Sequence, residues 1–164
     1  MSTPTDHRIK LDDITLSYRE WPGEQGTLLC LPSFAAHKGS FDSIAQALSP
    51  QYRVIALDLR GRGDSDKPND GYGFAYHVQD ILQLMSHLQI NSFSIIGHSF
   101  GATVGTYLAS IRPQVVQSIV MLEGGADPTA AVLEAIRPSL EGLEKSYHSL
   151  DEYIAAMRQL PFYN

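Results

Sequence analysis

Apolar and polar residues alternate in two distinct ways along this chain, and each pattern predicts a kind of element. Near the N-terminus, the run 14–19 alternates singly between apolar and polar positions, and it follows a shorter run, 8–11, across the Asp12-Asp13 turn. Single alternation is typical of a strand with one buried face, so the two runs predict an antiparallel hairpin. Four later segments are apolar at mostly consecutive positions, as expected for strands buried on both faces of a parallel sheet. They are 27–31, 53–57, 93–97 and 115–122.

The segments between these strands have apolar residues at helical spacing. The clearest case is 76–88, where apolar side chains recur every three or four positions and the opposite side is polar. Weaker patterns predict helices over 40–48 and 101–111. Strands separated by helices predict an α/β fold, with a mostly parallel sheet, helices on both faces and a functional site at the carboxyl ends of the strands.

The pattern changes after Glu123-Gly124-Gly125. From about residue 128 to residue 164 it predicts helices without a strand, and Ser149 with Glu152 three residues later forms a capping box. We therefore expect two parts. They are the N-terminal part of an α/β core over 1–126 and an incomplete helical cap, or lid, segment over 127–164.

Charge and composition exclude several classes of partner. The formal charge is -6 and the pI is about 5.4, with no cluster of lysine or arginine, which argues against nucleic acid and anionic membranes. The single cysteine, Cys30, cannot form an internal disulfide and lies in an apolar run. No stretch approaches the roughly 18 apolar residues of a membrane span. We expect a cytoplasmic protein with no cofactor and no metal site.

The most informative motif follows the strand 93–97. It reads Gly97-His98-Ser99-Phe100-Gly101, a strand, a sharp turn and the start of a helix. The middle residue of so tight a turn is strained, and the flanking glycines relieve crowding, so the Ser99 hydroxyl is expected to be exposed. The backbone N-H of Phe100 then lies at a helix start, where negative charge is favoured.

Three motifs in this order resemble the α/β-hydrolase superfamily, in particular its cap-bearing serine hydrolase branch. They are Leu31-Pro32-Ser33-Phe34, the segment 58–68 (Asp-Leu-Arg-Gly-Arg-Gly-Asp-Ser-Asp-Lys-Pro), and Gly97 to Gly101. The likeness extends from Arg8 to Asn164, and the middle motif is the most specific. Complete members of the family continue beyond the lid, so the C-terminal third is expected to be absent. It is truncated, supplied by another chain or naturally missing.

The resemblance implies roles for particular residues. Ser99 corresponds to the nucleophile, and the backbone N-H groups of Phe34 and Phe100 correspond to the oxyanion hole. The family usually has His-Gly where this chain has Pro32-Ser33, which leaves the Phe34 donor less certain than the Phe100 donor.

The triad partners of the serine are harder to assign. A minority of the family takes the triad acid from the end of the sixth strand, which is Glu123 here; its other interpretation is a carboxylate at the lid entry. His98 and His37 are candidates for contacts with substrate. The histidine base normally follows the serine. His148 is the only histidine after Ser99 in this sequence. It is either the base or a solvated histidine of a loop.

The expected function is a serine hydrolase of small, largely uncharged ester or C-C bond substrates, acting through an acyl-enzyme on Ser99. Serine at this position argues against haloalkane and epoxide chemistry, for which the family uses aspartate. The alternative is a non-catalytic binding or regulatory module with the same fold. By itself the 164-residue chain is expected to be inactive and to self-associate through the unprotected edge of 115–122, or to bind a complementing C-terminal chain.

Overall fold

A computed structural model describes residues 3–124, 129–142 and 145–159 of the chain. The chain forms two compact units, Met1–Gly125 and Ala126–Asn164. The first unit contains a six-stranded sheet with the strand order β1-β2-β4-β3-β5-β6. Its strands are β1 (Thr5–Lys10), β2 (Thr15–Trp21), β3 (Thr27–Leu31), β4 (Arg53–Asp58), β5 (Phe93–His98) and β6 (Val116–Leu122).

The sheet is mostly parallel, which confirms the predicted fold class. Strands β1 and β2 pair antiparallel as the expected hairpin, and β2 is also antiparallel to β4. Strands β4, β3, β5 and β6 are parallel to one another. The hairpin is longer than expected, because β1 begins at the polar residue Thr5, opposite Glu20, where the sequence showed no apolar alternation.

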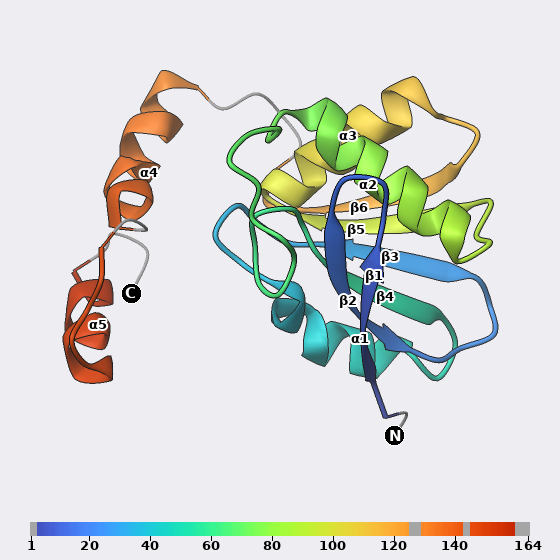
Figure 1. The fold of residues 1–164 in the computed structure, drawn as a ribbon, viewed down its shortest axis with the longest axis horizontal. Coiled ribbons are helices and arrows are strands. Elements are labelled where there is room, and N and C mark those ends of the chain that lie inside the picture. The colour runs from blue at the N-terminus through green and yellow to red at the C-terminus, as the bar shows by residue number, and fades with distance from the viewer. Residues whose placement is uncertain (1–2, 125–128, 143–144, 160–164) are drawn as a thin grey trace. The chain divides into compact units, whose positions relative to one another are not determined.

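Helices cover both faces of the sheet (Figure 1). A short 3₁₀ helix, η1 (Lys38–Phe41), leads into α1 (Asp42–Leu48) on one face. Helices α2 (Phe74–His87) and α3 (Phe100–Ile111) lie on the opposite face. The prediction of a single helix over 40–48 was wrong at its start. Its first turn is 3₁₀, capped by the His37 side chain, which accepts a hydrogen bond from the Gly39 N-H.

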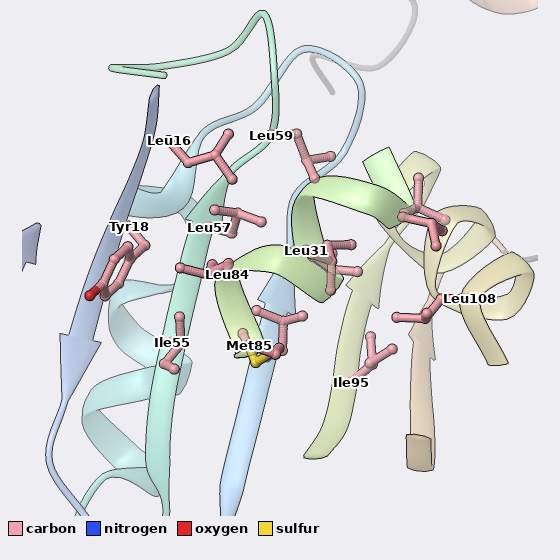
Figure 2. Close-up of a cluster of buried hydrophobic side chains, with 14 of the residues drawn as sticks. Leu16, Tyr18, Leu31, Ile55, Leu57, Leu59, Leu84, Met85, Ile95 and Leu108 are labelled. Atoms are coloured by element: carbon pink, nitrogen blue, oxygen red, sulfur yellow. The ribbon is translucent and has the colours of Figure 1, made fainter. Parts of the chain in front are cut away.

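Alternate residues of the buried strands contribute to two separate cores. Leu29, Leu31 and Leu57 belong to the larger core, between the sheet and helices α2 and α3 (Figure 2). Cys30 and Ala56 belong to the smaller core beside α1. This division explains why the central strands are apolar at consecutive positions. Burial also raises the pKa of the Cys30 thiol to about 12, as for an unreactive core residue.

The described part of the second unit is helical, with α4 (Ala130–Gly142) and α5 (Leu150–Met157). The Ser149 side chain accepts a hydrogen bond from the Glu152 N-H at 3.1 Å. The Glu152 carboxylate accepts one at 2.8 Å from the N-H of His148, the residue before the N-cap. The predicted cap is therefore confirmed at Ser149, while the Glu152 bond is shifted by one residue from a standard capping box. The sequence did not predict that α4 runs through Pro138. The helix start expected at Asp127-Pro128 and the stop expected at Pro161 lie outside the described residues.

None of the helices in the described ranges has both the length and the apolar composition needed to cross a bilayer.

Candidate active site

Ser99 occupies a strained turn between β5 and α3. Its backbone has φ 49° and ψ -112°, in a region that residues other than glycine rarely adopt. Such strain costs about 1–3 kcal/mol and tends to occur at functional sites. The Ser99 N-H donates to the carbonyl oxygen of Leu122 at 2.9 Å, so the end of β6 supports the turn. The predicted strand, sharp turn and helix are confirmed at this position.

Glycines on either side of Ser99 allow this turn to pack closely. A Cβ atom at Gly101 would lie 2.1 Å from the carbonyl oxygen of Leu31, and one at Gly97 would lie 2.6 Å from the backbone of Ala102. Real Cβ atoms do not approach backbone atoms so closely, so these positions exclude any other residue without a shift of the backbone. The start of α3 therefore packs directly against the end of β3. The β3 loop (residues 32–37) begins at this contact.

Phe34 of the β3 loop and Phe100 of α3 lie together, as the resemblance implied. Their rings meet edge to face with centroids 5.7 Å apart, and the Phe34 ring is nearly half exposed. Within the described ranges, neither the Phe34 N-H nor the Phe100 N-H donates a hydrogen bond. An oxyanion hole requires N-H groups that are free to donate to the substrate. The assignment of these two N-H groups to an oxyanion hole remains a prediction.

A buried ion pair fixes the end of the β3 loop. The Asp58 carboxylate accepts hydrogen bonds from the Lys38 N-H at 2.6 Å and from the Lys38 ammonium at 2.8 Å. Asp64 accepts a further bond from the same ammonium at 2.6 Å. Burial by itself would lower the pKa of Lys38, but the bonds to Asp58 and Asp64 outweigh it and the pKa is raised. Lys38 therefore stays charged and ties the β3 loop to the segment after β4.

That segment, the β4 loop (residues 59–73), is itself tied to α2. The Arg60 guanidinium donates two hydrogen bonds to the Asp80 carboxylate, both 2.7 Å long, and a third to the Gly71 carbonyl oxygen at 2.8 Å. Both side chains of this pair are buried. Burial raises the pKa of Asp80, and the nearby Arg60 charge partly offsets the rise. The charged residues of the segment 58–68 thus hold the β4 loop in position. The sequence did not reveal this role.

Glu123 and His98 lie close together at the carboxyl ends of β5 and β6. The His98 Nε2 atom is 3.6 Å from a Glu123 carboxylate oxygen, and the Glu123 side chain is 91% exposed. Glu123 has a positive φ of 50°, and a Cβ atom on the next residue, Gly124, would lie 2.7 Å from the Ser99 Cα. Glu123 is therefore a close neighbour of the serine turn. Its role as triad acid and the contact of His98 with substrate remain predictions.

His37 is exposed at the end of the β3 loop, where its Nδ1 atom caps η1. A contact with substrate at His37 also remains a prediction. His148 is exposed in the second unit, and its assignment as a base is a prediction of the same kind.

The sequence did not identify His77 as a neighbour of the site. It is 1% exposed on α2, and its ring lies 5.2 Å from the Phe100 ring. Burial, followed by the charges of Arg62 and Arg60, lowers the pKa of His77 to about 4, although the Tyr72 backbone offsets this slightly. His77 is therefore neutral at pH 7 and supports the Phe100 ring. From the sequence, the position of His77 relative to the apolar residues of α2 indicated only a surface or packing residue.

Within the described ranges, no group of three or more His, Cys, Asp or Glu side chains is placed to bind a metal ion. In the same part of the chain, no histidine hydrogen-bonds to Ser99.

Comparison with known proteins places this site in context. A family model described as "alpha/beta hydrolase fold" matches residues 26–160. The chain is 35% identical to a "Serine hydrolase-like protein" of Danio rerio over 62% of its own length and 32% of that protein. It is 37% identical to a "Soluble epoxide hydrolase" of Corynebacterium sp. (strain C12) over 75% of its length and 43% of that protein. The chain thus spans less than half the length of these curated relatives.

A solved structure agrees with the fold. The crystal structure of E-2-(Acetamidomethylene)succinate Hydrolase superimposes with a TM-score of 0.79 at 26% identity, over 95% of this chain and 58% of that one.

Proposed function

Since the chain belongs to the α/β-hydrolase fold family, we propose that the protein is a serine hydrolase in which Ser99 is the nucleophile. Curated relatives are named as hydrolases, which supports hydrolysis as the general reaction. The observation that carries the finer proposal is the strained Ser99 turn, together with the Phe34 and Phe100 N-H groups, which have no acceptor in the part of the chain that the structure describes.

The proposed reaction proceeds through an acyl-enzyme. The Ser99 oxygen attacks the substrate carbonyl carbon while a base removes the hydroxyl proton, and the carbonyl oxygen becomes an oxyanion. The Phe34 and Phe100 N-H groups donate to this oxyanion. Removing one such donor typically costs about 2.7–4 kcal/mol of transition-state stabilisation. The leaving group departs with a proton, and water then hydrolyses the acyl-enzyme to regenerate Ser99.

The proposed substrates are small esters or compounds with a cleavable C-C bond next to a carbonyl, largely uncharged near that bond. Phe34, Phe74 and Phe100 supply aromatic surface next to the serine turn, since both other rings lie 5.7 Å from the Phe100 ring. Epoxide hydrolases occur among the relatives. Because this chain has serine where those enzymes are expected to have aspartate, we do not assign epoxide opening to it.

A fluorophosphonate probe with peptide mapping tests the nucleophile on the complete protein in which this chain occurs. We expect one label, on Ser99, lost in Ser99→Ala and retained in Ser110→Ala. Ser110 is a matched control, because it is an exposed serine near the far end of the same helix. Labelling that survives Ser99→Ala would exclude Ser99 as the nucleophile.

A non-catalytic binding module is the second candidate. It is favoured by the lack of a histidine bonded to Ser99 within the described ranges. Tight ligand binding by the complete protein, with no turnover and no effect of Ser99→Ala, would support this function instead.

A further inference from the structure

We infer that Arg62 is a positioning residue that holds both members of the proposed oxyanion hole, Phe34 and Phe100. This inference rests on the proposed function. Arg62 lies on the β4 loop, 28 residues from Phe34 along the chain. Its Nε-H donates a hydrogen bond to the Phe34 carbonyl oxygen at 2.9 Å. Its guanidinium carbon lies 4.5 Å from the centroid of the Phe34 ring and 5.4 Å from that of the Phe100 ring.

These contacts restrain Phe34 at its backbone and at its side chain together. The hydrogen bond fixes the carbonyl group of Phe34 itself, and the cation lies against its ring. A guanidinium can do both, since its planar fork of donors binds carbonyl oxygens while its faces stack on aromatic rings. The same group also contacts Phe100, so one side chain sets the spacing of the two residues that supply the N-H donors.

The β3 loop has few other restraints near Phe34. The loop contains no glycine, and its own backbone bond runs from the Ala36 N-H to the Ser33 carbonyl oxygen at 3.2 Å. Its far end is fixed at Lys38 by Asp58. Between these points Phe34 is exposed, and a residue with an exposed ring needs another support to keep a fixed backbone. Arg62 provides that support.

Arg62 is itself firmly held. Its N-H donates to the Leu59 carbonyl oxygen at 2.9 Å, and its Nη1 atom donates to the Arg60 carbonyl oxygen at 2.8 Å. Arg60 is locked by its paired bonds to Asp80. Within the described ranges Arg62 makes no ion pair, so its bonds there go to carbonyl oxygens and rings. This pattern requires the shape of a guanidinium in addition to its charge.

The test compares Arg62→Lys, which keeps the charge, and Arg62→Gln, which keeps a donor, with the control Arg112→Gln. Arg112 is exposed and its side chain donates to the carbonyl oxygen of its neighbour Ile111. All are made in the complete protein. The measurements are kcat and KM for a short-chain p-nitrophenyl ester, the inhibition constant of an alkyl boronic acid, which forms a tetrahedral adduct with an active-site serine, and the Tm.

Both Arg62 variants should lower kcat by about 10- to 100-fold, the range expected when a donor is misplaced by about 1 Å. KM should change less than about twofold, because the donors act mainly in the transition state. The boronic acid should bind more weakly by the same factor as kcat/KM falls. Methylguanidinium should restore part of the activity of Arg62→Ala, and Arg112→Gln should match the parent protein.

Unchanged kcat and boronic acid binding in folded Arg62→Lys and Arg62→Gln would overturn the inference and leave the proposed function intact. So would a loss confined to Tm or KM, which indicates a structural role only. Turnover that survives Ser99→Ala would instead refute the proposed function. If Arg62→Gln does not fold, Arg62→Lys and the rescue of Arg62→Ala by methylguanidinium still decide the question.

Discussion

Asp58 binds Lys38 through both carboxylate oxygens, one bonded to the backbone N-H and the other to the side-chain ammonium. The Asp58 and Lys38 side chains are 0% and 6% exposed. Since β4 ends at Asp58 and Lys38 begins η1, this pair joins the ends of two segments that border the site. The pair predicts a strong dependence of stability on Asp58.

Asp58→Asn should reduce the free energy of unfolding by about 3–5 kcal/mol, because it leaves the Lys38 charge buried with a weaker partner. Asp64→Asn is the matched control. Its carboxylate bonds to the same ammonium but is 70% exposed, so it should cost much less. Urea unfolding of the three proteins measures the difference. Equal losses would show that the buried position of Asp58 adds nothing.

Gly101→Ala should disrupt the contact between α3 and β3. The added Cβ would lie 2.1 Å from the Leu31 carbonyl oxygen, so the backbone must shift at the start of α3. We expect a loss of more than about 2 kcal/mol in unfolding free energy, together with loss of fluorophosphonate labelling at Ser99. Gly73→Ala is the control, because a Cβ there has no atom within 4 Å. A stable, labelled Gly101→Ala protein would contradict the packing described.

The stability of the protein should fall between pH 6.5 and pH 4 through His77. Its pKa is lowered to about 4 in the folded protein from 6.5 in the unfolded chain, so the unfolded chain binds more protons in this range. The neutral buried form therefore contributes stability that is fully present above pH 6.5 and is lost as the pH falls toward 4, by about 3 kcal/mol.

Urea unfolding at pH 7 and at pH 4.5 measures this effect. His77→Leu should remove part of the loss, whereas His87→Gln, an exposed histidine on the same helix, should not. The comparison separates His77 from the carboxylates that titrate in the same range. An equal acid loss in the parent protein and His77→Leu would refute the assignment.

Measured by itself, the 164-residue chain should self-associate through β6. Within the described ranges β6 pairs with β5 alone, and its Val120 and Met121 side chains are 51% and 54% exposed. An edge strand with exposed apolar residues is a site for pairing with another chain, and a lysine on the edge opposes it. Val120→Lys should therefore shift the chain toward the monomer in sedimentation velocity. A parent chain that is monomeric at high concentration would contradict this prediction.

The same chain should hydrolyse esters very slowly. A serine hydrolase without its base retains a rate advantage over water of only about 10³ to 10⁴-fold. Turnover of a p-nitrophenyl ester by the 164-residue chain and by the complete protein provides the comparison. Full activity of the short chain, abolished by His148→Ala, would show that His148 is the base and that the sequence-based expectation was mistaken.

The sequence by itself determined the order of strands and helices and the position of the Ser99 turn. The consecutive apolar residues of β3, β4 and β5 match strands with both faces covered, whereas those of β6 leave Val120 and Met121 exposed. Gly97 and Gly101 are required where no Cβ fits. Both constraints are local, because each depends only on residues that are close together in the sequence. The family motifs are equally local, and so the proximity of Phe34 to Phe100, the residue after Ser99, could be expected before the structure was known.

Tertiary structure alone decided which distant side chains meet. The strand order β1-β2-β4-β3-β5-β6 places the β4 loop beside the β3 loop, and this brings Arg62 to Phe34. The pairing of β5 with β6 likewise brings His98 close to Glu123. The packing of α2 on α3 brings His77 to Phe100. Apolar periodicity records that a residue is buried but not against which partner. The contacts between loops depend on the order in which strands pair, which no short stretch of sequence encodes.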